Sequence, residues 1–252
     1  MTVLALAATE TTLSPAAEGR DPDVLTRITD PAVQLAIWSR PRPPMLDWID
    51  GLEWDVIDDI DAPITGPDFL PAITRLLCDA GYPQTAQGEM LVSEVEGQAI
   101  RFAQIMDCLD LRLRLEVIES DACRKFHMDY VRARLLMTLA GEATQWIEVE
   151  AQPDAPVHQL AVGDVAIFKG RLDADEPAIL HRSPPIAGTR GRRLLLALDP
   201  VSEPRMPIDR ISSGTSPRRR ASGSRSEIPD RPHRQSRVRG RGMAGKREPG
   251  RA

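Results

Sequence analysis

The sequence has few aromatic residues and few cysteines. Phenylalanine, tryptophan and tyrosine make up 4% of its 252 residues, which is too few to build the base-stacking platforms of single-strand-binding proteins. The three cysteines, Cys78, Cys108 and Cys123, are an odd number spread over a mid-sized chain, which argues against a disulfide framework. We therefore expect an aliphatic core and reduced thiols.

Long hydrophobic runs are also missing. No stretch reaches the about 18 apolar residues that a membrane-spanning helix needs. The apolar residues 3–8 have no basic residue ahead of them, unlike a secretory signal. These two absences predict a cytoplasmic protein without a membrane partner. The expected partner is a small molecule or another, unidentified substrate.

The net charge of −5 conceals an asymmetry between the body of the chain and its end. Residues 203–252 carry 14 Lys/Arg against 5 Asp/Glu, so the rest of the chain is strongly acidic. Residues 202–252 are rich in Pro, Gly, Ser and Arg and offer too little apolar surface to offset the entropy cost of ordering. We predict a disordered basic tail, for which nucleic-acid contact is a weaker alternative than a passive role.

The first part of the chain is predicted to contain a leader and a helical layer. Residues 1–22 are small and polar without periodicity, which favours a disordered leader. Residues 23–107 are expected to form helices near residues 31–38, 45–49, 69–77 and 90–106. Asp30 is the expected N-cap of the first helix. The last helix has one apolar stripe for packing on a sheet, formed by Leu91, Val95, Ala99, Phe102 and Met106.

After Cys108 the hydrophobic period changes from about 3.6 to 2. Residues 111–117 alternate strictly between apolar and charged side chains, which is typical of a half-buried strand. Further strand-like runs lie at residues 126–139, 144–149, 165–169, 178–182 and 193–198, with turn residues between them. Six strands at this spacing predict an antiparallel barrel or sandwich in residues 108–201.

The same region contains residue types that bind metal ions. In an extended chain His127 and Asp129 project from one face, roughly 7 Å apart at Cα, whereas on a helix they would diverge. Arg132 and Arg134 are then expected to face outward. The ligands would sit at the inner mouth of a barrel with a hydrophobic floor made of Val131, Ala133, Leu135, Met137 and Leu139.

A second histidine, His181, lies in a later predicted strand and completes the set. Two histidines and one carboxylate form the facial triad that binds non-haem Fe(II) and leaves three coordination positions open. Zn²⁺ or Mn²⁺ would also accept these ligands. Cys123 has the same parity as His127 and Asp129, and as a fourth ligand it would close a zinc site that cannot catalyse.

The order of these motifs resembles the cupin-like Fe(II)/2-oxoglutarate dioxygenases. The parts are the His127-x-Asp129 motif, a Gly-Asp turn at 163–164 that opens an apolar strand, His181, and an arginine beyond it. The resemblance implies an α+β protein with an antiparallel double-stranded β-helix, the cupin-like jelly roll. It also implies Fe(II) and 2-oxoglutarate as cofactors, with the far carboxylate of 2-oxoglutarate bound by Arg193 or Arg190.

A closer resemblance is to a bacterial family known as domain of unknown function 1826. It rests on Cys-Arg-Lys-Phe-His-x-Asp-x-Val from residue 123, Phe-Lys-Gly at 168–170 and His-Arg-Ser-Pro-Pro at 181–185, and it covers about residues 30–200. The family is associated with zinc-homeostasis gene neighbourhoods. This implies an alternative function, a non-catalytic zinc-binding protein linked to metal homeostasis.

Three further side chains are candidates for a substrate pocket. Trp146 lies in a predicted strand and would line the mouth of the site, although a strand tryptophan more often packs in a core. Lys169 and Arg182 would attract an anionic substrate, although cations at strand ends are more often solvated. The leading hypothesis is a metal-dependent oxygenase of unknown substrate.

Overall fold

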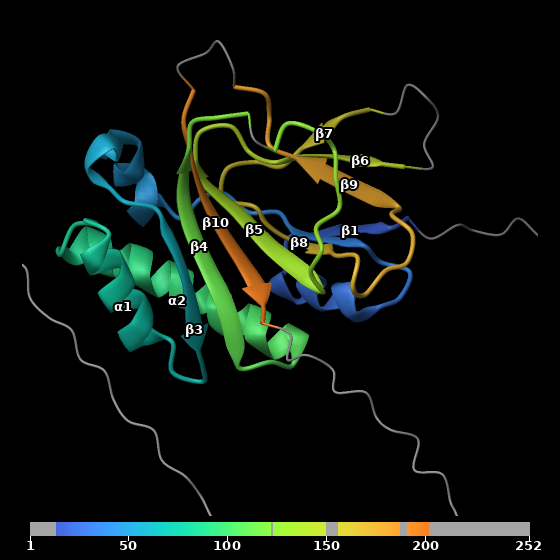
Figure 1. The fold of residues 1–252 in the computed structure, drawn as a ribbon, viewed down its shortest axis with the longest axis horizontal. Helices are drawn as coiled ribbons and strands as arrows, with labels where there is room; N and C mark the ends of the chain where they lie inside the picture. Colours follow the sequence, from blue (N-terminus) through green and yellow to red (C-terminus); the bar gives the residue numbers. More distant parts are fainter. Residues whose placement is uncertain (1–13, 122, 150–155, 187–190, 202–252) are drawn as a thin grey trace, which may run out of the picture. The chain divides into compact units, whose positions relative to one another are not determined.

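The protein is described by a computed structural model that covers residues 14–121, 123–149, 156–186 and 191–201. It is a mixed α+β fold in which helices cover one face of a large β-sheet and a small sheet lies on the other side (Figure 1). The predicted tail, residues 202–252, and most of the predicted leader lie outside the described residues. No helix in the described part of the chain is long and apolar enough to cross a membrane.

The large sheet has seven strands in the order β1-β2-β8-β5-β10-β4-β3. Neighbouring strands are antiparallel except for the parallel pair β1–β2. The small sheet has the order β7-β6-β9 and is antiparallel. The strands are β1 (Ala16–Gly19), β2 (Leu35–Trp38), β3 (Ile60–Thr65), β4 (Asp110–Ile118), β5 (Ala133–Ala140), β6 (Gln145–Glu148), β7 (His158–Gln159), β8 (Val165–Lys169), β9 (Ile179–Arg182) and β10 (Arg193–Pro200).

Two α-helices and three 3₁₀ helices make up the helical layer. They are η1 (Pro22–Thr29), η2 (Pro44–Gly51), η3 (Trp54–Val56), α1 (Leu70–Asp79) and α2 (Ala86–Met106). The apolar stripe predicted for the last helix is confirmed, because all five of its residues are buried in α2 against the sheet. The helices predicted near residues 45–49 and 69–77 correspond to η2 and α1.

The N-terminal prediction needs three corrections. The leader does not extend to residue 22, since Ala16–Gly19 forms β1. The predicted helix at residues 31–38 is wrong: Leu35–Trp38 is strand β2, and Asp30 is the C-cap of η1 instead of an N-cap. A short apolar run buried on both faces does not distinguish a strand from a buried helix by its period. Strand β3, at the sheet edge, was not predicted.

The large sheet separates two hydrophobic cores. Alternate residues of each strand point to opposite faces, so Leu135, Met137 and Leu139 of β5 face the helices. Leu136 of β5 and Phe168 of β8 instead join the core between the two sheets. This second core forms the apolar surroundings of the candidate site.

Candidate metal centre

The three predicted ligands come from two segments that a backbone bridge joins. His127 lies in the connection between β4 and β5, and His181 lies in β9. The amide nitrogen of each histidine donates to the carbonyl oxygen of the other at 3.0 Å. Asp129 follows two residues after His127. The pairing therefore brings residues that are distant in sequence to one place.

The side chains converge as well as the backbones. His181 Nε2 lies 3.1 Å from Asp129 Oδ2, and His127 Nε2 lies 3.6 Å from Asp129 Oδ1. The two imidazole centroids are 4.7 Å apart. One ligand atom from each of the three residues lies within 4.8 Å of the others. This spacing lets a single ion reach all three after small side-chain adjustments, because metal–ligand bonds are about 2.0–2.2 Å long.

The tautomer of His127 suits a metal ligand. Its Nδ1 lies 2.8 Å from the carbonyl oxygen of Lys125. A carbonyl only accepts hydrogen bonds, so Nδ1 carries the proton and Nε2 is the nitrogen that can bind an ion. Contact with Asp129 raises the pKa of His127 above its usual value. An ion at this place would take the position of the proton on Nε2.

The charge of Asp129 also suits a cation. Burial acts to raise the pKa of this carboxyl, but contacts with His127, His181 and the Arg134 guanidinium outweigh burial and hold the pKa well below its usual range. The carboxylate is therefore ionised at neutral pH, as a metal ligand must be. Its Oδ2 is buried beside nitrogens of Arg134 and His181, and its Oδ1 lies on the side of His127 Nε2. The donor set thus fits a divalent cation.

His181 is the most enclosed of the three residues. It is 6% exposed, and its ring lies 4.5 Å from the ring of Phe168. Burial lowers the pKa of His181, which favours the neutral imidazole that binds metals. The side chain of His127, in contrast, is 35% exposed. The site therefore opens to solvent on the His127 side.

The sequence comparison identifies the family. A family profile described as "Protein of unknown function (DUF1826)" matches residues 19–199. The chain belongs to this family. The segment that matches the DUF1826 profile contains His127, Asp129, His181 and Arg193, so the candidate site lies within the matched part of the chain. No curated protein matches the sequence.

Solved structures with a similar arrangement include several dioxygenases. The dioxygenase for auxin oxidation 1 from Arabidopsis thaliana, in a complex with 2-oxoglutarate, has a TM-score of 0.45 at 8% identity, covering 77% of this chain and 94% of that one. A Pseudomonas putida prolyl-4-hydroxylase has 0.40 at 10% identity, covering 70% and 95%. A full-length Neurospora crassa protein in complex with alpha-KG has 0.37 at 13% identity, covering 79% and 88%. With TM-scores below 0.5, these likenesses carry no functional inference for the DUF1826 chain.

The residues of β5 that face the site differ from those predicted. Arg132 faces outward as expected and pairs with Asp173, but the outward assignment of Arg134 is wrong, since its Nη1 lies 2.6 Å from Asp129 Oδ2. The predicted strand at residues 126–139 begins only at Ala133, after bends at residues 130–132. These bends break the alternation, so Ala133, Leu135, Met137 and Leu139, which were predicted as the floor of the site, face the helices, and Arg134 and Leu136 lie on the side of the site. No turn residue in the sequence marks this break.

Two further candidate site residues, Cys123 for the metal and Arg190 for 2-oxoglutarate, do not join the triad in the described structure. Cys123 is exposed and does not belong to the group of converging ligand atoms. Its backbone carbonyl accepts a hydrogen bond from the Ser183 amide, so the turn carrying Cys123 is attached to the strand end while the thiol faces solvent. The structure thus corrects the fourth-ligand prediction. Arg190 lies outside the described residues.

Lys169 and Arg182 do not face the site. Lys169 follows Phe168 in β8, so it projects from the opposite face, where its Nζ donates to the Asp30 carbonyl at 2.7 Å. Arg182 follows His181 in β9 and likewise projects outward, with its guanidinium 4.3 Å from the Phe126 ring. Strand alternation therefore removes both cations from the predicted substrate pocket.

Trp146, which was predicted to line the site, lies next to His181. It is directly opposite His181 in the β6–β9 pair and is 8% exposed within the core between the sheets. Its ring stacks on the ring of His158 of β7, with centroids 4.2 Å apart. His158 itself is exposed. Trp146 thus lies beside His181.

The loop that carries Asp129 depends on a close approach of two backbones. The Arg171 amide donates to the Asp129 carbonyl at 2.9 Å, and the Gly170 amide donates to the Arg132 carbonyl at 2.8 Å. A Cβ at Gly170 would lie 2.0 Å from the Val131 carbonyl oxygen. Only glycine therefore allows the segment after β8 to hold the metal-site loop this closely.

We expect Gly170→Ala to lower the free energy of unfolding by about 1–3 kcal/mol, the usual cost of overpacking. Gly97→Ala in α2 is the control, because a Cβ there meets nothing within 4 Å and should stabilise the helix by up to about 1 kcal/mol. Urea denaturation of both variants measures the difference. Equal stability of Gly170→Ala and the wild type would show that the loop does not need this contact.

Proposed function

We propose that the chain is a metal-dependent oxygenase of the Fe(II)/2-oxoglutarate type, with Fe(II) held by His127, Asp129 and His181. The observation that carries this proposal is the convergence of two imidazoles and one ionised carboxylate on a single point, open on one side. Three ligands leave three positions for a cosubstrate and dioxygen. Bound Fe(II) would supply the redox chemistry, and the protein would supply position and surroundings.

The winding of the chain supports the finer assignment to a double-stranded β-helix. From β4 onward, successive segments alternate between the two sheets: β4 in the large sheet, the bridge at His127 beside the small sheet, β5 in the large sheet, β6 and β7 in the small one, then β8, β9 and β10 in alternation. This alternation is the pattern that the resemblance to cupin-like proteins implies. His127 and Asp129 lie in the connection between β4 and β5, and His181 lies in β9, the strand that this connection contacts.

Arg193 is our candidate for binding the far carboxylate of 2-oxoglutarate. It is 1% exposed at the start of β10. Its Nη2 donates to the hydroxyl oxygens of Thr144 and Thr138 at 3.0 and 3.3 Å. Its Nε and Nη1 are buried without a hydrogen-bond partner among the described residues. A buried cation with two free donors in one plane is matched to a carboxylate.

The position of Arg193 is consistent with this role. Thr144, its nearer hydroxyl partner, lies two residues before Trp146, which pairs directly with His181. The guanidinium is therefore on the side of the large sheet that faces the triad. Burial lowers the pKa of Arg193 to about 10, which still leaves the group charged at neutral pH. Phe168 and Trp146 belong to the apolar core between the sheets, on this same side of the large sheet.

The alternative, a zinc-binding protein without turnover, depends on a fourth protein ligand. The exposed Cys123 outside the ligand group does not support it. An open triad is the arrangement of a catalytic site, whereas a structural zinc site is closed by four ligands. We therefore favour the oxygenase.

Metal analysis followed by turnover tests the two functions. Protein purified without chelators should contain bound metal and, with Fe(II), should release succinate from 2-oxoglutarate. Cys123→Ala should retain both properties, and His127→Ala should lose both. Zinc that disappears in Cys123→Ala would support the closed site instead. A wild-type protein with neither metal nor succinate release would refute the oxygenase.

A further inference from the structure

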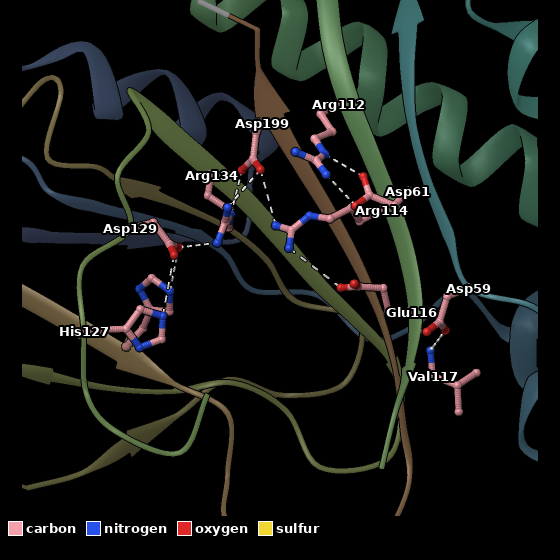
Figure 2. A network of polar contacts seen from close by, with 11 residues as sticks. Asp59, Asp61, Arg112, Arg114, Glu116, Val117, His127, Asp129, Arg134 and Asp199 are labelled. Atoms are coloured by element: carbon pink, nitrogen blue, oxygen red, sulfur yellow. Dashed lines mark hydrogen bonds and ion pairs between the residues drawn. The ribbon is translucent and has the colours of Figure 1, made fainter. Parts of the chain in front are cut away.

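Asp129 is held by an arginine that no sequence pattern indicated. Arg134, the second residue of β5, places Nη1 2.6 Å from Asp129 Oδ2. Figure 2 shows the Arg134 guanidinium between the carboxylates of Asp129 and Asp199. The side chain of Arg134 is 16% exposed and that of Asp129 is 15% exposed. This is an enclosed ion pair and not a solvated surface contact.

The opposite edge of Arg134 is fixed by a bidentate contact. Its Nε and Nη2 donate to the two carboxylate oxygens of Asp199 in β10, at 2.6 and 2.9 Å. Asp199 also accepts from Arg114 Nη2 of β4 at 3.3 Å. The chain of charges thus crosses three neighbouring strands, β5, β10 and β4 (Figure 2). Arg134 has little freedom to leave Asp129.

Other contacts fix the side chains of His127 and His181, whereas the Asp129 side chain depends on Arg134 for its orientation. The Lys125 carbonyl fixes the ring of His127, and His181 is enclosed in β9 beside Phe168. Asp129 lies in an irregular segment before β5, where no strand pairing sets its side-chain torsions. Carboxylates that bind metals are usually hydrogen-bonded themselves, and such outer contacts orient them.

We propose that Arg134, anchored by Asp199, is a positioning residue that occupies part of the Asp129 carboxylate, so that Asp129 offers the metal a single oxygen. The proposal rests on the metal site proposed above. A carboxylate that binds through one oxygen, together with two imidazoles, fills three positions of an octahedral ion. A carboxylate that binds through both oxygens would fill a fourth. Arg134 thereby preserves the open positions that a cosubstrate and dioxygen need.

Co(II) binding to the full chain tests this role. Arg134→Gln removes the charge and the fork-shaped contact, and we expect its dissociation constant for Co(II) to rise by roughly 10–100-fold, the usual effect of losing an outer contact to a ligand. Asp199→Asn should act in the same direction to a smaller extent, because Arg134 keeps its contact with Asp129 but loses its anchor. Arg134→Lys should restore only part of the affinity.

Arg112→Gln is the matched control. Arg112 of β4 makes a bidentate contact with Asp61 of β3, at 2.5 and 2.6 Å, so it has the same chemistry across neighbouring strands. It has no contact with the triad, and we expect unchanged Co(II) affinity. The Co(II) absorption spectrum adds a second measurement, since a change in the number of carboxylate oxygens alters it. If the Arg134–Asp199 pair only stabilises the contact between β5 and β10, its loss would change the melting temperature without changing the Co(II) spectrum or the Co(II) affinity of the folded protein.

The outcomes separate the two proposals. A Co(II) affinity and spectrum equal to those of the wild type in folded Arg134→Gln overturn the positioning role of Arg134. If Arg134→Gln does not fold, unchanged affinity and spectrum in both Arg134→Lys and Asp199→Asn overturn it. A wild-type protein that does not bind Co(II) overturns the metal site itself, and the positioning role fails with it.

Discussion

Replacing His181 with alanine is expected to abolish the stabilisation that a bound metal gives to the folded chain. An ion that binds only the native state adds about 2.7 kcal/mol when present at 100 times its dissociation constant. For a folded body of this size that is a rise of roughly 5–10 °C in melting temperature. His181 is one of the three residues whose ligand atoms converge, so its loss should weaken binding by more than the roughly 10–100-fold expected for an outer contact.

The experiment compares melting temperatures with and without Co(II). His158→Ala is the control, because His158 is an exposed histidine close to the site that stacks on Trp146 and does not belong to the ligand group. The wild type and His158→Ala should both gain several degrees on addition of Co(II), and His181→Ala should gain none. A Co(II)-dependent rise that persists in His181→Ala would show that the ion binds elsewhere.

Much of the large sheet and the triad could be predicted because their residues follow simple periods. In β4 every second residue is charged, so the strand was evident from its alternation. The stripe of α2 likewise follows the helical period. The candidate site was predicted mainly from residue type, because two histidines and one carboxylate in separate strand-like segments are the ligand set of a facial triad.

What could not be predicted depends on contacts between distant segments. Residues 35–38 are buried on both faces because β2 lies between β1 and β8, and this removes the alternation that would have marked a strand. The bends before Ala133 lie where the segment after β8 forms backbone hydrogen bonds with the loop, and Arg134 follows these bends with its side chain against Asp129. Local sequence contains no signal for either pairing.

The orientation of Lys169 likewise could not be predicted from local sequence. Strand β8 is apolar on both faces, so its sequence does not say whether Phe168 or Lys169 faces the site. Only its position between β2 and β5 decides this. Arg193, a cation on the side of the large sheet that faces the triad, opens an apolar strand and is nearly inaccessible.

Replacing Arg193 with methionine is expected to stabilise the protein and to abolish its binding of 2-oxoglutarate. A buried guanidinium with unpaired donors costs free energy, and Nε and Nη1 of Arg193 are in this state within the described structure. Methionine is flexible and apolar and can fill the space. Against this gain stand the hydroxyls of Thr138 and Thr144, which lose their donor. We expect a net gain on the order of 1–2 kcal/mol in the free energy of unfolding.

A buried guanidinium with two donors that lack a partner among the described residues is best explained by a ligand that pairs with it. Urea denaturation should show the higher stability of Arg193→Met, and Fe(II)-dependent succinate release should fall to background. Arg193→Lys keeps a charge without the planar fork, so it should retain weak 2-oxoglutarate binding without the gain in stability. If Arg193→Met is instead less stable and still releases succinate, Arg193 is a structural residue, and the carboxylate of 2-oxoglutarate must be bound by another group.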